Sequence, residues 1–166
     1  MFETLNGRAV SWAEIGITIN VLGGVTAPTI DIKSIDHEST VDVGEQRGAS
    51  GGQVIKQTTG QGSYSASATF YRDGMRDLKK ALLAAATTAG FVNRRGQVQL
   101  SKVRFDVVIT HDWEDDPEIY VVKLLGCRVT KDSGKHAEGT DPETVDIDLK
   151  PLSIVEIING VETVLL

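Results

Sequence analysis

The sequence predicts a β-dominated α+β domain in which two packed antiparallel β-sheets, a sandwich or partial barrel, carry one flanking α-helix. Three segments alternate apolar and polar residues with a period of two, which places one set on each face of a sheet: 64–71, 103–109 and 144–149. Only 73–89 repeats its apolar residues at helical spacing. The 166 residues, 40% hydrophobic and 24% charged, suit one globular domain over 1–166.

The first half of the chain contributes short strands and one long polar segment. Residues 15–22 and 30–35 are weakly patterned strand candidates. Between them and the alternating strand 64–71 lies 43–62, which carries six glycines with Gln, Ser and Thr between them. Because segments of this kind do not pack by themselves, we expect 43–62 to be an extended loop or long hairpin.

The predicted helix over 73–89 has an apolar face with several alanines, so it can lie close to a sheet. Asp73 is the expected N-cap and Gly90 the expected C-cap.

The second half reads as strands. The apolar run 119–125 predicts a strand covered on both faces, with a bulge at Gly126. A polar segment, 131–142, predicts a second loop. The stretch 152–166 predicts two strands joined by a hairpin turn at the Asn-Gly pair 159–160.

Composition excludes several classes of function. The net charge is −6, from 17 basic and 23 acidic residues, which disfavours tight binding to nucleic acid. No run approaches the ~20 apolar residues of a membrane span, and residues 1–5 lack the pattern of a signal peptide. The single cysteine, Cys127, allows no internal disulfide and is expected to be a buried small hydrophobe. We therefore expect a soluble protein made inside a cell, with no membrane partner.

The sequence offers no constellation for catalysis. His37, His111 and His136 are far apart and have no partner at ligand spacing. The acidic segment 111–118 could hold Ca²⁺ or Mg²⁺, but it lacks EF-hand spacing, and a solvated turn explains it better. The glycine-rich 48–52 lacks the Lys-Ser/Thr of a phosphate loop. We expect no catalytic residue, no metal and no cofactor, hence no enzyme.

A binding module is the main rival to a structural role. A small β-sandwich that binds a protein or a carbohydrate through its loops needs exposed aromatic rings. Trp12, Trp113 and Tyr64 are the available candidates, and this small number weakens that interpretation.

The order of features along nearly the whole chain resembles the tail tube proteins of tailed bacteriophages and the related tubes of phage-derived contractile particles. The resemblance includes the single helix and the glycine-rich segment that enters an alternating strand. Its motifs are Ile-Lys-Ser-Ile-Asp at 32–36, Gly-Gln-Gly-Ser-Tyr-Ser at 60–65, Phe-Asp-Val-Val-Ile at 105–109, Leu-Gly-Cys-Arg-Val at 125–129, Gly-Thr-Asp at 139–141, Val-Asp-Ile-Asp-Leu at 145–149 and Ile-Ile-Asn-Gly-Val at 157–161.

The resemblance implies a structural virion protein. In that family two orthogonally packed sheets carry a flanking helix, and six subunits form a ring whose inner sheets join into one barrel. Stacked rings form a hollow tail tube through which DNA passes during injection. The implied partners are other copies in a homo-hexamer, the tail sheath, the tail terminator and the baseplate. The implied location is the virion, after assembly in the host cytoplasm. The alternative is the tube of a headless contractile bactericidal particle or of a secretion-like injection system.

Three sets of residues would serve such an assembly. The segment 43–62 is expected to reach a neighbouring subunit through Gly44, Gln46, Arg47, Gly51, Gly52, Gln53, Lys56, Gln57 and Gly60. The polar faces of the strands around 63–70 and 145–149 are expected to line the lumen through Ser63, Ser65, Ser67, Asp146 and Asp148. A basic stripe on the helix is expected to be a solvent-facing surface that meets the sheath, through Arg72, Arg76, Lys79 and Lys80.

Overall fold

The computed structural model describes residues 15–21, 25–27, 32–49, 51–111, 120–136 and 138–164. These ranges form antiparallel strands, one α-helix and a short 3₁₀ turn, which confirms the β-dominated fold class. The elements are β1 (Ile15–Val21), β2 (Val25–Ala27), β3 (Ile32–Arg47), β4 (Val54–Tyr71), α1 (Arg72–Ala89), η2 (Leu100–Lys102), β5 (Phe105–His111), β6 (Tyr120–Gly134), β7 (Thr144–Lys150), β8 (Ser153–Ile158) and β9 (Val161–Thr163).

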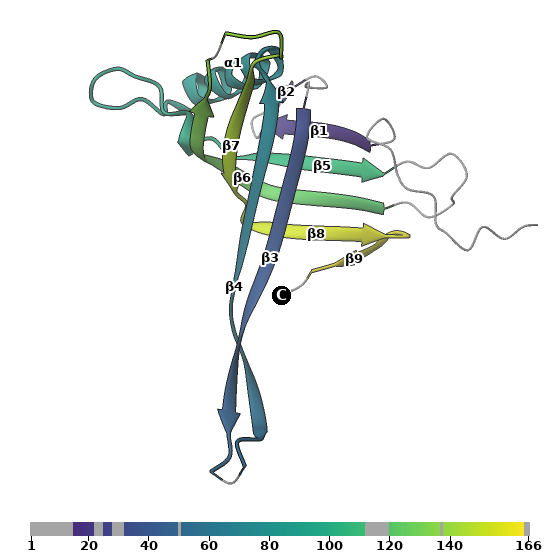
Figure 1. The fold of residues 1–166 in the computed structure, drawn as a ribbon. Helices are drawn as coiled ribbons and strands as arrows, with labels where there is room; N and C mark the ends of the chain where they lie inside the picture. The colour runs from purple at the N-terminus through teal and green to yellow at the C-terminus, as the bar shows by residue number, and fades with distance from the viewer. Residues whose placement is uncertain are drawn as a thin grey trace, which may run out of the picture.

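The strands form two sheets that share β6. The first sheet has the order β2-β1-β5-β6-β8-β9, and the second has the order β6-β7-β4-β3. The first part of β6 pairs with β5 and β8, and 128–134 pairs with β7. In Figure 1 the strands of the second sheet run crosswise to those of the first, and the connected sheet is not closed into a barrel.

The predicted bulge in β6 lies where the two sheets meet. Gly126 has a φ of 63°, and the Asp106 carboxylate accepts a hydrogen bond from its N–H at 2.8 Å. A Cβ on Gly126 would stand 2.8 Å from Cδ1 of Leu152. The left-handed backbone and the close approach both favour glycine here. The corner between the sheets therefore depends on this residue.

The hydrophobic core lies between the two sheets and beneath α1. The helix buries Met75, Leu78 and Leu82 together with several alanines, as its periodicity predicts. The largest fully buried side chains are Phe70, Leu78, Leu82, Phe105, Val107, Val122, Leu124, Cys127 and Ile147. Gly90 is the C-cap, with a φ of 71°, as predicted.

The prediction of Asp73 as N-cap is wrong. The helix begins at Arg72, and Tyr71, the last residue of β4, is the N-cap without a side-chain capping bond. The Arg72 N–H instead donates to the carbonyl of Glu143 at 3.2 Å. A tertiary backbone hydrogen bond therefore sets the start of the helix.

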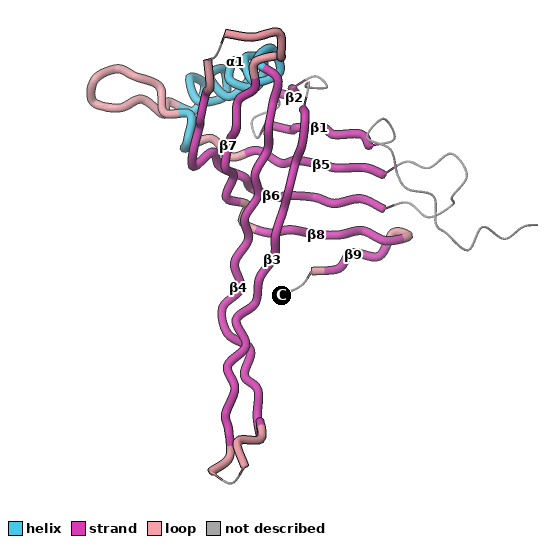
Figure 2. Tube along the Cα trace, viewed as in Figure 1, coloured by secondary structure: helices cyan, strands magenta, loops and turns pink. Residues whose placement is uncertain are grey.

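The segment 43–62 is not an open loop. It forms the outer part of a long β3–β4 hairpin, with paired residues from Val43 opposite Thr59 to Arg47 opposite Val54. We call this outer part of the hairpin, residues 43–62 with the turn at its end, the arm. Figure 2 shows strands along the arm and a short turn at its end. The second expected loop, 131–142, is also shorter, because β6 continues to Gly134.

The C-terminal hairpin is confirmed. β8 and β9 pair across a turn in which Asn159 and Gly160 have φ values of 50° and 80°, the conformation that favours an Asn-Gly pair. No helix in the described ranges is long and apolar enough to cross a membrane.

Candidate assembly surfaces

The arm projects from the body (Figure 1), and none of its residues with assigned burial belongs to the core. Two of its apolar side chains are exposed, Val43 at 56% and Val54 at 43% of their full accessible area. The Gly48 N–H donates to the Gln53 carbonyl at 3.0 Å and closes the turn. A two-stranded ribbon without a third strand is at best marginally stable in water. The arm therefore has the properties of a segment that packs on another molecule.

Close strand contacts shape the arm. A Cβ on Gly60 would stand 2.8 Å from the Asp42 carbonyl oxygen, and one on Gly44 would stand 2.6 Å from Thr58 Oγ1. Figure 1 shows β3 and β4 crossing partway along the arm. Glycines at these two positions allow the tight crossing that a strongly twisted ribbon requires.

The structure brings all nine expected inter-subunit residues onto the arm. Their contacts with another subunit stay a prediction. Six lie in its paired strands and three at its tip: Gly44, Gln46, Arg47, Lys56, Gln57 and Gly60, then Gly51, Gly52 and Gln53.

The expected lumen residues share one face of the four-stranded sheet. Ser67 lies opposite Asp148, and Thr69, opposite Asp146, donates a 2.7 Å hydrogen bond to the Asp146 carboxylate. The other face of these strands is buried and includes Phe70, Ala68 and Ile147. Ser63, Ser65, Ser67 and Asp146 are exposed, and Asp148 is half-exposed. The structure thus brings the five predicted residues together.

The same face has charged residues that the sequence analysis missed. On β3, Asp36 lies opposite Ser67 and Glu38 lies opposite Ser65. On β6, Lys131 lies opposite Asp148, with Nζ and a carboxylate oxygen 3.9 Å apart. The only signal for these residues was the alternating polar segment 34–40. It is hard to recognise as a strand, because its other face does not carry the regular apolar residues that mark a half-buried strand.

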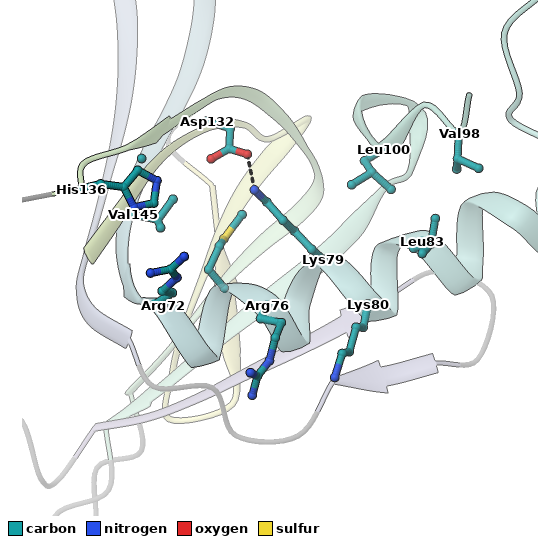
Figure 3. A pocket seen from close by; sticks show the side chains of 12 residues that line it. Arg72, Arg76, Lys79, Lys80, Leu83, Val98, Leu100, Asp132, His136 and Val145 are labelled. Atoms are coloured by element: carbon teal, nitrogen blue, oxygen red, sulfur yellow. Dashed lines mark ion pairs between the residues drawn. The ribbon is translucent and has the colours of Figure 1, made fainter. Parts of the chain in front are cut away.

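The expected basic stripe on α1 is mostly paired with acids. Arg72 forms an ion pair with Glu143, Arg76 lies 3.3 Å from Asp73, and Lys79 lies 2.5 Å from Asp132. Figure 3 shows Lys79 reaching Asp132, while Arg76 and Lys80 project away from that contact.

The basic stripe borders a groove beside α1. The groove has a volume of about 880 Å³, and Met75 of the apolar face of α1 lines it together with the four basic residues. Its other apolar lining residues are Leu83, Val98, Leu100 and Val145. The groove is therefore lined by both apolar and charged side chains.

The remaining titratable groups form no catalytic arrangement among the described residues. His111 and Tyr120 have ring centroids 5.2 Å apart; burial lowers the pKa of His111, and the nearby His37 lowers it further. Burial and the neighbouring Glu156 raise the pKa of Tyr120. Burial, with Asp106 nearby, raises the pKa of Cys127 to about 12, so this thiol is a buried, inert group.

Metal and ring-stacking sites find no support in the described ranges. No group of three or more His, Cys, Asp or Glu residues there could hold a metal ion. Tyr64 is half-buried against the core, so it offers no free ring. Trp12, Trp113 and the acidic residues after His111 lie outside the described residues.

Comparison with known proteins places the fold. The sequence matches no protein-family model and no curated protein. A chain from the six-fold symmetrised baseplate of the anti-feeding prophage superposes with a TM-score of 0.60 at 12% identity, covering 92% of this chain and 97% of that one. A chain from the sheath/tube terminator of the PVC extracellular contractile injection system gives 0.59 at 14%, covering 92% and 98%. The SPP1 tail tube protein gives 0.53 at 10%, covering 89% and 78%. At the level of fold, the resemblance to tail tube proteins is confirmed.

Proposed function

We propose that this chain is a structural subunit of a hollow tail tube, in a tailed phage or a phage-derived contractile particle. The observation that carries the proposal is the four-stranded sheet: one face is polar and exposed, and both edge strands lack a partner within the described part of the chain. These edges are 32–41 of β3 and 128–134 of β6. An unpaired edge is a template for a further strand, and ring closure satisfies every edge.

The strand directions suit cyclic assembly. Three antiparallel pairings separate β3 from β6, so these two edges run antiparallel to each other. A copy rotated about a ring axis therefore presents its β6 edge antiparallel to β3, and the alternation continues around the ring. Six copies fit the resemblance to tail tube proteins and the six-fold symmetry of the AFP baseplate structure.

The polar face of this sheet would line the lumen. It carries Asp36, Glu38, Asp146 and Asp148, and β4 contributes only hydroxyl side chains to it. Arg128, Lys131 and Lys150 share this face, so its carboxylates only slightly outnumber its cations. Phosphates bind Lys and Arg, and this excess of carboxylates would weaken the hold on passing DNA. The net charge of −6 agrees with this role.

The arm would join successive rings or adjacent subunits. Its exposed Val43 and Val54 would be buried on the neighbouring copy, and its tip glycines permit close backbone approach. The groove beside α1 would face the sheath, with Arg76 and Lys80 in its lining. The terminator and the baseplate would cap the tube at its two ends. The particle would assemble in the host cytoplasm, and the chain would have no enzymatic activity.

A contractile injection particle is the second candidate setting. The chains from the AFP and PVC particles superpose with TM-scores of 0.60 and 0.59, against 0.53 for the SPP1 tail tube. In that setting the same ring and stacking contacts would form, and the lumen would carry a different cargo.

Size-exclusion chromatography and negative-stain electron microscopy of the purified chain test the proposal. We expect six-fold rings, and stacks or tubes of rings at higher concentration. A protein that stays monomeric at all concentrations and salt levels contradicts the proposal and favours a binding module.

A further inference from the structure

We infer that the exposed face of the four-stranded sheet is acidic at one edge and basic at the other, and that this polarity selects how a second copy of the chain docks. The inference rests on the proposed function and identifies the lateral contact within a ring. Its basis is the strand register together with the positions of the charged side chains.

The β3 edge is acidic on this face. The alternating positions 34–40 that share the face carry Asp36 and Glu38 between a serine and a threonine. Both carboxylates are exposed, and their partners on β4 are serines. Within the described ranges, no cation lies at ion-pair distance from either carboxylate, so both can receive a partner from another molecule.

The β6 edge is basic on the same face. Arg128 lies opposite Lys150 of β7, and Lys131 lies opposite Asp148, whose carboxylate is 3.9 Å from Nζ and offsets one of these three cations. Arg128, Lys131 and Lys150 are all exposed. Asp132 pairs with Lys79 of α1, which covers the buried side of the sheet, so Asp132 does not offset these cations. A hollow of about 600 Å³ on the exposed face is lined from β3 to β7 by Asp36, Glu38, Ser65, Ser67, Asp148 and Lys150.

Two modes of edge pairing differ in charge. When β3 of one copy pairs with β6 of the next, two carboxylates face two cations across the new ladder. When β3 pairs with β3 of a two-fold related copy, the carboxylates of both copies face each other. Cross-strand contacts between opposite charges stabilise a sheet, and like charges destabilise it. The polarity therefore favours the head-to-tail contact, which closes a ring, over a symmetric dimer.

Complementary charge reversals test the inference. The acid-edge variant is Asp36→Lys with Glu38→Lys, and the base-edge variant is Arg128→Glu with Lys131→Glu. Each variant has two edges of the same sign, so each alone should need at least about tenfold more protein to assemble at low salt. Mixed in equal amounts, the two should assemble again, because each edge of one is complementary to the opposite edge of the other. A variant with all four changes should assemble by itself.

Matched controls carry the same change of charge elsewhere. Arg94→Glu with Arg95→Glu controls for the loss of cations, and Glu138→Lys with Asp141→Lys controls for the loss of acids; all four side chains are exposed. Far-UV circular dichroism and thermal unfolding verify that each variant folds. High salt should reduce the difference in the protein concentration needed for assembly between the charge-reversed variants and the wild type, since salt screens exposed charges.

The outcomes separate the two proposals. If the wild type forms rings and the two variants assemble equally well, the inference about edge charge is overturned, but the proposed function as a tube subunit is not. Failure of the folded variants to rescue each other in the mixture also overturns it, because complementary edges must restore the contact. A wild-type chain that never assembles overturns the proposed function and, with it, this inference.

Discussion

Removal of the arm should abolish stacking and leave the fold intact. Deleting 46–58 joins Glu45 to Thr59. Because Val43 pairs with Thr59, Gly44 and Glu45 become a two-residue turn between paired strands. Glycine at the first central position suits a type II′ hairpin turn. The shortened hairpin therefore needs no rearrangement of the body.

The expected loss of stability is small because the described residues of the deleted segment add nothing to the core of the body. Apart from the intermediate Gly48, its residues with assigned burial are exposed, and none belongs to the core. We expect the free energy of unfolding to change by less than about 1 kcal/mol, which for a chain of this size shifts Tm by at most roughly 2–4 °C.

Two measurements decide the result. Thermal unfolding by circular dichroism, at concentrations below assembly, should give a cooperative transition near that of the full chain. Negative-stain microscopy at high concentration should show no tubes, and isolated rings are allowed only if the arm acts between rings. Tubes of normal length from the deletion variant would refute the assigned role of the arm.

Three further predictions concern Gly126 at the corner between the sheets, His111 at the end of β5, and the basic residues of α1. Gly126→Ala should destabilise the chain by about 1–2 kcal/mol, because alanine is strained at the φ of 63°. Adding Leu152→Ala should not restore stability, because the Leu152 side chain can move aside while the backbone strain persists. Full recovery of stability in urea denaturation would show instead that the steric clash with Leu152 dominates. The free energy of unfolding should fall as pH decreases from 6.5 through the lowered pKa of His111, because the unfolded chain takes up that proton more readily. Denaturation measured at about pH 5 to 8 should show a weaker pH dependence of stability in His111→Asn than in the wild type. An unchanged pH dependence would exclude His111 as its source. Arg76→Glu with Lys80→Glu should weaken co-assembly with the sheath while tubes still form, and normal sheath co-assembly would reject the groove as a docking surface.

The predictable parts of the fold are those in which burial leaves a pattern. Strand 144–149 and the helix alternate or repeat apolar residues because one face packs on the core. Gly126 and the Asn-Gly turn were predictable because their backbone conformations require those residue types.

The arm and the charged edges were less predictable for physical reasons. Nearly all residues of the arm with assigned burial are exposed, so selection for burial leaves no apolar alternation in 43–62. Asp36 and Arg128 join the exposed face of the four-stranded sheet only through strand pairing over long sequence distances. The ion pairs along α1 likewise join the helix to Asp132 and Glu143, which no local pattern reveals.

A reconstruction of the self-assembled particle by electron cryo-microscopy would show how the subunits pair in the ring. We expect a six-fold ring in which β3 of each subunit pairs antiparallel with 128–134 of the next. In that ring Asp146 and Asp148 face the bore, and α1 lies on the outside. A ring with α1 toward the bore, or with β3 unpaired between subunits, would contradict this expectation.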